Sequence, residues 1–172
     1  MFTLHEPTGQ DNHAFYRFAF ALDARVRMFN FVEEKAGKAI VIVDDEMSFT
    51  DLLGRLLGEH FCCPILTFSN PLKLLDALPR LDIGILVTDY YMPHRNGLDL
   101  IRKMGELLPH APPCLLITGH ALDDDDETVR PAHLKAILPK PFRWQQLASL
   151  IEKHWPADAV SPLRDKNPSL HD

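Results

Sequence analysis

Five short runs of apolar, largely β-branched residues recur along the chain, and each leads into a segment with helical spacing. The runs cover residues 38–45, 62–68, 83–87, 114–117 and 135–138. Such runs, bounded by turn-forming residues, are typical of strands buried on both faces. Strands that alternate with helices form a parallel sheet with right-handed crossovers. The pattern therefore predicts an α/β fold with a doubly wound, five-stranded parallel sheet over residues 38–154.

The segments between these runs carry apolar residues three and four positions apart, which predicts helices on both faces of the sheet. Asn70 and Pro71 are expected to begin one helix, with Asn as the cap and Pro in the first turn. The acidic run 123–127 is expected to begin another, because negative charge suits a helix N-terminus. Pro64 interrupts the run 62–68, which places that strand near an edge of the sheet.

Two extensions flank this predicted domain. Residues 1–37 allow two interpretations: an amphipathic helix over 12–34, docked on the domain or on a second copy, or a poorly ordered leader. The helical spacing comes from five apolar residues: Phe15, Phe18, Leu22, Val26 and Phe29. Residues 155–172 contain several prolines and no apolar period, and we expect this tail to be disordered.

Composition excludes several classes of function. The chain is 46% apolar and 24% charged, close to an average globular domain. Its net charge of −6, with no long basic run to offset it, argues against direct nucleic-acid binding. The apolar stretch 14–22 contains Arg17 and is too short to span a membrane. We therefore expect no membrane partner.

The three cysteines cannot all pair with one another. Cys62, Cys63 and Cys114 each sit among apolar residues, which favours buried thiols in a reducing compartment. A redox pair between the adjacent Cys62 and Cys63 is the alternative. Together with the missing membrane span, the cysteines favour a cytoplasmic protein.

Polar residues stand where four of the expected strands end. Asp44 and Asp45 follow the first strand, Asp89 the third, Thr118 the fourth and Lys140 the fifth. The carboxyl ends of parallel strands meet at one edge of a sheet, where open α/β folds place their chemistry. Each residue alone has an ordinary explanation, a helix cap for an aspartate or a solvated lysine. All five at one edge favour a functional site.

The expected chemistry follows from the charges. Three clustered carboxylates repel one another unless a cation neutralises them, and Mg²⁺ prefers oxygen ligands. An aspartate neutralised in this way can attack phosphorus as a nucleophile. The oxygens of a transferred phosphoryl group need positive and hydrogen-bonding partners, which Lys140 and Thr118 can supply.

These motifs resemble the receiver domain of two-component response regulators. The match rests on Ile-Val-Asp-Asp-Glu (42–46), Thr-Asp-Tyr-Tyr-Met-Pro (88–93), Asn-Gly-Leu (96–98), Ile-Thr-Gly (117–119) and Lys-Pro-Phe (140–142). It covers about residues 38–154, and all motifs occur in order on the expected elements. The resemblance implies a flavodoxin-like fold with strand order 2-1-3-4-5.

The resemblance also implies roles for the site residues. Asp89 would accept a phosphoryl group from a histidine kinase or a histidine phosphotransfer protein. Asp44 and Asp45 would hold Mg²⁺ together with Asp89 and the backbone carbonyl of Tyr91. A downstream protein would bind the face formed by the fourth helix, fifth strand and fifth helix of such a domain, which would be a monomer or a weak homodimer.

At the same edge, Thr118 and Lys140 would contact the acyl phosphate, and the Lys140–Pro141 peptide bond would be cis. One position departs from the family pattern. Many members carry Phe or Tyr three residues before the lysine, and this chain has Ile137 there. We therefore expect the output signal to travel mainly through backbone shifts.

The sequence thus predicts a single-domain receiver that acts as a phosphorylation-gated switch or phosphoryl shuttle, and not as an enzyme for an external substrate. The short tail leaves no room for a helix-turn-helix output domain. Two alternatives stay open: an aspartyl-phosphate phosphatase of the haloacid dehalogenase type, and a non-phosphorylated adaptor with a receiver fold. The phosphatase chemistry requires a suitable second acid two residues after the nucleophile. Asp89 is followed by Tyr90 and Tyr91, and Asp44 by Asp45 and Glu46, so neither sequence fits and the phosphatase is disfavoured.

Overall fold

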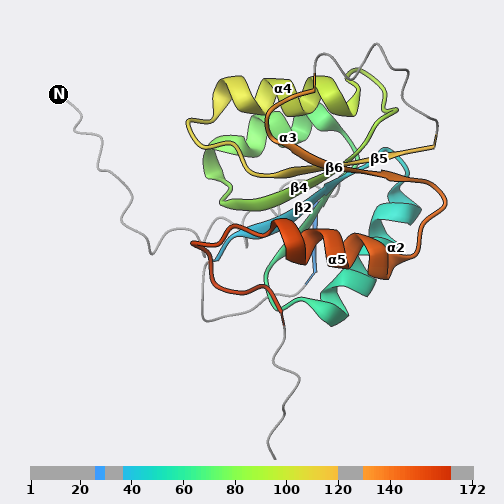
Figure 1. Ribbon diagram of the computed structural model, residues 1–172. Coiled ribbons are helices and arrows are strands. Elements are labelled where there is room, and N and C mark those ends of the chain that lie inside the picture. The colour runs from blue at the N-terminus through green and yellow to red at the C-terminus, as the bar shows by residue number, and fades with distance from the viewer. Residues whose placement is uncertain (1–25, 30–36, 120–129, 164–172) are drawn as a thin grey trace, which may run out of the picture.

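The computed structural model describes residues 26–29, 37–119 and 130–163. A six-stranded sheet lies between two layers of helices (Figure 1). Its strands, in chain order, are β1 (Val26–Phe29), β2 (Ala39–Val43), β3 (Ile65–Phe68), β4 (Ile83–Asp89), β5 (Cys114–Thr118) and β6 (Leu134–Pro139). One face is covered by α3 (Pro71–Ala77) and α4 (Gly97–Leu107), the other by α2 (Met47–His60) and α5 (Trp144–His154).

Five of these strands form the predicted parallel sheet. They lie in the order β3-β2-β4-β5-β6, and every neighbouring pair among them is parallel. Numbered among themselves along the chain, these five strands have the order 2-1-3-4-5. The flavodoxin-like fold is therefore confirmed.

The strand β1 corrects the helix expected near the N-terminus. It pairs antiparallel with β3, with Val26 opposite Phe68 and Phe29 opposite Ile65. The helix expected over 12–34 is therefore wrong for Val26–Phe29, and the other residues of that range lie outside the described part. The expectation that β3 lies near an edge of the sheet is confirmed, because only β1 lies outside it. Pairing explains the strand at Val26–Phe29, since β-branched and aromatic residues suit a strand and the backbone of β3 needs a second partner.

Local sequence explains how the helices next to the site begin. Asn70 caps α3 by accepting a hydrogen bond from the amide of Leu72, and Pro71 occupies the first turn, as predicted. Asn96 caps α4 by accepting from the amide of Asp99 at 2.8 Å. The helix expected from the acidic run 123–127 lies outside the described residues.

The core consists of two apolar clusters, one on each face of the sheet. One contains the inward residues of α3 and α4, and the other those of α2 and α5. All seven residues of β4 are buried, which places this strand at the centre of the domain. A strand buried on both faces needs a continuous apolar run, and this requirement explains the pattern of residues 83–87.

The expected disorder of the tail is wrong for its first part. The indole of Trp155 donates a hydrogen bond to the carbonyl of Val160 at 3.0 Å. Leu163 forms an antiparallel bridge with Phe61, and the amide of Cys62 donates to the carbonyl of Pro162 at 2.7 Å. These backbone contacts fix residues 155–163 without any apolar period. The remainder, 164–172, lies outside the described part.

The three cysteines are free thiols, and Cys114 is buried whereas Cys62 and Cys63 are part-buried, so the expectation of buried thiols holds fully only for Cys114. Burial raises the pKa of Cys63 to about 12 and that of Cys114 to about 12. A thiol with so high a pKa forms little thiolate at neutral pH, which argues against a reactive vicinal pair.

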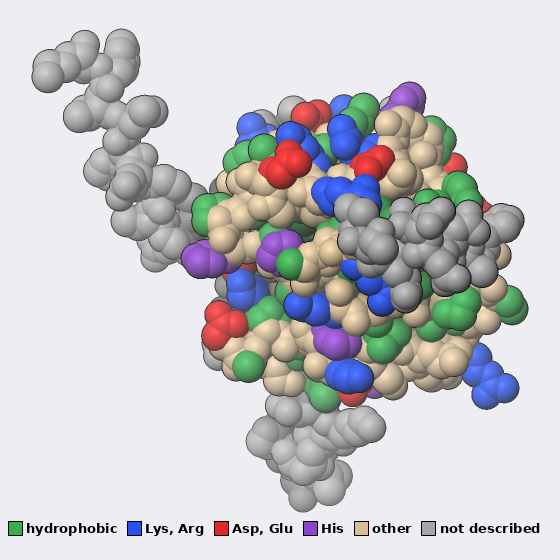
Figure 2. Space-filling model, turned by 45° about the horizontal axis from the view of Figure 1, so that its top comes forward, with side chains coloured by type: hydrophobic (Ala, Val, Ile, Leu, Met, Phe, Trp, Pro, Cys, Tyr) green, Lys and Arg blue, Asp and Glu red, His purple; other side chains and the backbone are tan. Residues whose placement is uncertain are grey.

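The helices and the surface charges can be compared with the expectations from composition. Within the described ranges, no helix is long and apolar enough to cross a bilayer. Figure 2 shows basic side chains in small groups on the face drawn, interleaved with acidic and hydrophobic ones. This mixed surface agrees with the charge pattern of the sequence.

Candidate functional site at the carboxyl ends of the strands

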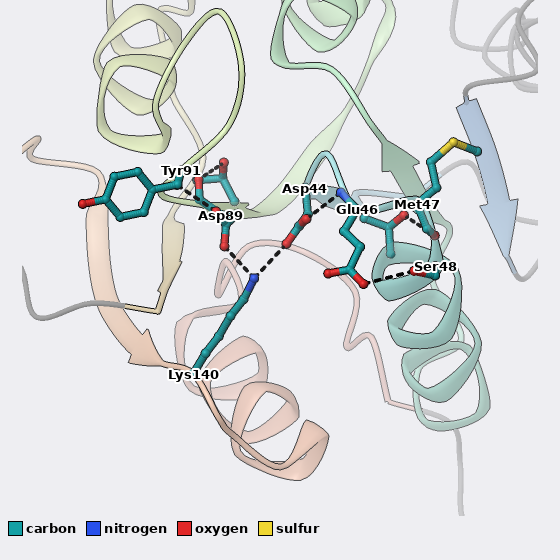
Figure 3. A network of polar contacts seen from close by, with 9 residues as sticks. Asp44, Glu46, Met47, Ser48, Asp89, Tyr91 and Lys140 are labelled. Atoms are coloured by element: carbon teal, nitrogen blue, oxygen red, sulfur yellow. Dashed lines mark hydrogen bonds and ion pairs between the residues drawn. The ribbon is translucent and has the colours of Figure 1, made fainter.

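Four of the predicted site residues gather at one edge of the sheet. Asp44 follows β2, Asp89 ends β4, Thr118 ends β5 and Lys140 follows β6 directly. Figure 3 shows Asp44, Asp89 and Lys140 close together there. Asp44, Asp89 and Thr118 are only 3%, 7% and 3% exposed. Buried carboxylates are rare unless they are paired, so this edge needs a compensating positive group.

Lys140 supplies that positive group. Its ammonium lies 2.7 Å from Oδ1 of Asp89 and 3.1 Å from Oδ2 of Asp44, and thus bridges the two carboxylates. Each carboxylate uses its other oxygen to accept a backbone hydrogen bond. Oδ1 of Asp44 accepts from the amide of Glu46 at 2.9 Å, and Oδ2 of Asp89 accepts from the amide of Tyr91 at 2.7 Å.

The pKa shifts show how this pair is balanced. Burial raises the pKa of Asp44 above its ordinary value, although the Glu46 amide and Lys140 both act to lower it. Burial alone would lower the pKa of Lys140, but hydrogen bonds and charges from Asp89 and Asp44 outweigh it and raise the pKa. Both pKa values are raised for one reason: desolvation has a larger effect on the deeply buried carboxyl group of Asp44 than on the part-exposed ammonium of Lys140.

Asp45, the fifth predicted site residue, differs from its neighbour Asp44 in burial. It is exposed, directly after the buried Asp44. Over the described ranges, no three acidic, histidine or cysteine side chains lie close enough together to hold a metal ion. The donors still fit Mg²⁺ chemically, because carboxylate oxygens converge here and already hold a cation, the Lys140 ammonium. A site that includes Asp45 and the carbonyl of Tyr91 stays a prediction.

The backbone ties these strand ends together. The amide of Lys140 donates to the carbonyl of Thr118 at 2.7 Å, and the amide of Gly97 donates to the carbonyl of Tyr90 at 2.9 Å. A Cβ on Gly97 would overlap the carbonyl oxygen of Asp89 and come within 2.6 Å of a methyl group of Leu116. Glycine therefore lets α4 begin directly against the end of β4. The Lys140–Pro141 peptide bond is cis, as predicted.

Comparison with known protein families identifies the family to which this chain belongs. The family model of the response regulator receiver domain matches residues 40–152, which is more than half of the chain. The chain belongs to the response regulator receiver domain family. Receiver domains are signalling domains of two-component systems, so the predicted family is confirmed.

Curated relatives agree with this assignment over the same part of the chain. The chain is 35% identical over 122 residues to the chemotaxis protein CheY of Pseudomonas aeruginosa, covering 66% of this chain and 93% of that protein. It is 34% identical over 116 residues to the transcriptional regulatory protein FixJ of Bradyrhizobium diazoefficiens, covering 66% of this chain and 54% of FixJ. The chain therefore spans about half the length of FixJ.

Solved structures show the same architecture. A receiver domain from Clostridium thermocellum superposes with a TM-score of 0.60 at 25% identity, covering 68% of this chain and 93% of that one. The chemotaxis protein CheY4 of Vibrio cholerae superposes with a TM-score of 0.60 at 17% identity, covering 69% and 99%. At that identity the second likeness shows the fold alone.

Two features of this receiver domain bear on its signalling. Ile137 is part-buried and packs against the core on the face covered by α3 and α4, so no aromatic ring stands at this position of β6. Tyr91 is 59% exposed, and its ring points away from Asp89 and Lys140 (Figure 3). The Tyr91 amide thus contacts the site while its side chain lies at the rim.

One contact at the site was missed by sequence reasoning. Phe49, in the first turn of α2, places its ring 4.7 Å from the Lys140 ammonium. In the sequence, Phe49 is one apolar residue of the helical segment that follows the first predicted strand. No local pattern relates it to a lysine so far along the chain, so the contact emerges only from the fold.

Proposed function

We propose that this receiver domain accepts a phosphoryl group on Asp89 from a histidine kinase or a histidine phosphotransfer protein, and that this event switches its binding to a downstream protein. The observation that carries the proposal is the buried Asp89 carboxylate at the carboxyl end of β4, held 2.7 Å from the Lys140 ammonium. Such a carboxylate lies at a strand end and is desolvated, which suits a nucleophile.

The transfer step follows from these contacts. An oxygen of Asp89 attacks the phosphorus of a phosphohistidine, the phosphorus–nitrogen bond breaks, and the imidazole keeps the bonding electrons and takes up a proton. The Tyr91 amide orients one carboxylate oxygen throughout. Lys140 exchanges its contact with Asp89 for a phosphoryl oxygen, and the Thr118 hydroxyl donates to another.

Mg²⁺ fits this proposal as the cofactor. Asp44, Asp45, Asp89 and the backbone carbonyl of Tyr91 would hold it, and it would neutralise charge on the phosphoryl oxygens. The domain would promote its own phosphorylation and dephosphorylation in this way, without acting on an external substrate. Burial raises the pKa of Asp44 because it disfavours the ionised carboxylate, and added positive charge would favour that ionised form.

The test is intact-mass analysis after exposure to acetyl phosphate and Mg²⁺. We expect the native chain to gain the mass of one phosphoryl group and Asp89→Asn to gain none. Asp82→Asn is the matched control, because Asp82 pairs with Lys38 just before β4, at the opposite end of the strand. An unmodified native chain would refute the proposal and favour the non-phosphorylated adaptor.

The partner surface is proposed from the family. The downstream protein would bind β6, α5 and the segment between β5 and β6, and phosphorylation would alter this surface through backbone shifts at Thr118 and Lys140. We place this activity in the cytoplasm, with the domain as a monomer or weak homodimer and without direct nucleic-acid contact. Response regulators similar to this chain, such as FixJ, are longer, so activities of further domains are outside this proposal.

A further inference from the structure

The Lys140 ammonium has a third neighbour besides its two carboxylates. It lies over the ring of Phe49, 4.7 Å from the ring centre, within the range of a cation–π contact. The three neighbours come from different elements: Asp44 follows β2, Asp89 ends β4 and Phe49 lies in α2. Neither the proposed metal site nor the proposed phosphoryl contacts use Phe49.

The Phe49 ring is itself held in place. It makes an edge-to-face contact with Phe142, with ring centres 6.1 Å apart and planes at 86°. Phe142 follows Lys140 by two residues, so the ring over the ammonium and the chain that carries the lysine are packed together. Both rings are part-buried against the apolar cluster that joins α2 and α5. A ring fixed in this way presents a constant face to the ammonium.

An aromatic face suits this position for an electrostatic reason. Its quadrupole attracts an ammonium, yet it adds no net charge and provides no oxygen to compete for a metal ion. Lysine is flexible, and the Lys140 side chain is 32% exposed, so without such a contact it has freedom to turn toward water. The ring attracts the ammonium whichever anion it pairs with, carboxylate or phosphoryl oxygen.

We propose that Phe49 is a positioning residue for Lys140: its ring holds the ammonium over the site while the ammonium changes partners from Asp89 to a phosphoryl oxygen. The effect on phosphorylation rests on the function proposed above, whereas the effect on the position of Lys140 does not. Phe49 therefore acts through Lys140 and touches no reacting atom.

The first test weakens the quadrupole while nearly keeping the shape of the ring. Phenylalanines with one, two and three fluorines replace Phe49 in the full chain, and phosphorylation by acetyl phosphate is timed at saturating Mg²⁺. We expect the rate to fall stepwise, by about three- to tenfold for the trifluorinated ring. The same series at Phe61, a fully buried core residue, is the control and should leave the rate unchanged. A flat rate at position 49 would overturn the proposal.

The second test needs no phosphorylation. Protons held over an aromatic face shift upfield in the NMR spectrum, so the terminal side-chain protons of Lys140 should be shifted in the unphosphorylated chain. We expect the shift to persist in Phe49→Tyr and to disappear in Phe49→Leu, with the rate likewise kept by Tyr and lowered by Leu. An unshifted Lys140 in the native chain would overturn the proposal.

The two readouts separate the two proposals. A native chain that shows the Lys140 shift but takes up no phosphoryl group would refute the function proposed for Asp89 and support the placement of Lys140 by Phe49. A chain that is phosphorylated at a rate independent of the ring would support that function and refute the role of Phe49.

Discussion

The two ends of the parallel sheet are closed by opposite means. At the carboxyl end, the Lys140 ammonium joins two buried carboxylates, Asp44 and Asp89. At the amino end, the indole of Trp155 packs against Gly84 in β4, and residues 156–163 return to Phe61. One end is closed by charges and the other by the shapes of an aromatic ring and a glycine.

The charged groups at the carboxyl end can exchange their interaction partners, whereas the packed ring at the amino end cannot. Charged contacts can be redistributed when a new ion or phosphoryl group arrives, whereas removing one partner leaves a buried charge uncompensated. Close apolar packing has one good arrangement and is disturbed by a single methyl group. We therefore expect perturbations at the amino end to change stability alone, and those at the carboxyl end to change stability together with chemistry.

The largest effect is expected from Gly97→Ala at the carboxyl end. The new Cβ would overlap the backbone carbonyl of Asp89, which the strand pairing holds in place, so the start of α4 must move. We expect a loss of about 3 kcal/mol in unfolding free energy and slower phosphorylation of whatever folds. Urea denaturation and mass analysis measure the two effects. Unchanged stability would show that the end of β4 is more adaptable than the packing indicates.

Gly84→Ala should be the next largest and should affect stability alone. Its Cβ would come within 2.5 Å of the Trp155 ring, which can move only by giving up its hydrogen bond to Val160. We expect a loss of about 2 kcal/mol, partly relieved when Trp155→Ala is added. Gly105→Ala is the control, since its nearest neighbour is a His133 side-chain atom at 3.2 Å. A slower phosphorylation rate in Gly84→Ala would contradict the separation of the two ends.

Asp44→Asn tests the charged end through pH. The pKa of Asp44 is higher in the folded state than its unfolded value of about 3.8. The unfolding free energy of the wild type should therefore fall as the pH rises from about 3.8 through the folded pKa, because Asp44 loses its proton there. Asn cannot lose a proton, so the Asn variant should gain stability relative to the wild type across this window and keep a constant difference above it, as thermal unfolding at several pH values would show. A shift in the opposite direction would refute the dominance of burial at Asp44.

The smallest effect is expected from Tyr91→Asn. The side chain borders the approach to Asp89, but its ring is 59% exposed and points away from the carboxylate. We expect dephosphorylation to quicken by about threefold, far below the about 100-fold that a well-placed general base contributes. Decay of the phosphorylated mass measures it, and Tyr91→Phe should match wild type. Slower decay in Tyr91→Asn would refute screening by the ring.

Much of the fold could be predicted from the sequence because the local sequence patterns agree with the final arrangement of the strands and helices. The apolar run ending at Asp89 and the cap at Asn70 each carry their own signal, and alternation of strands and helices fixes the topology. The strand at Val26–Phe29 was predicted wrongly because its apolar residues fit a helical period as well. Pairing with β3 decides its conformation, and no local rule shows that partner.

The candidate site likewise has features that the sequence predicts and features that it does not. Asp44, Asp89, Thr118 and Lys140 were found because parallel strands end at one edge, whatever the side chains do there. The direct bridge by Lys140 and the exposed position of Asp45 depend on side-chain conformation, which spacing does not determine. The order of residues 155–163 was missed because it depends on backbone hydrogen bonds to Phe61 and Cys62 rather than on apolar periodicity.

The antiparallel pairing of β1 has a consequence for folding during synthesis on the ribosome. Val26 lies opposite Phe68, so β1 leaves the ribosome well before the strand that completes it. At about 5–20 residues per second, the delay is about 2–8 s, far longer than the microseconds in which a local hairpin forms. Because β3 pairs with both β1 and β2, neither of these two pairings can form until β3 has been synthesised.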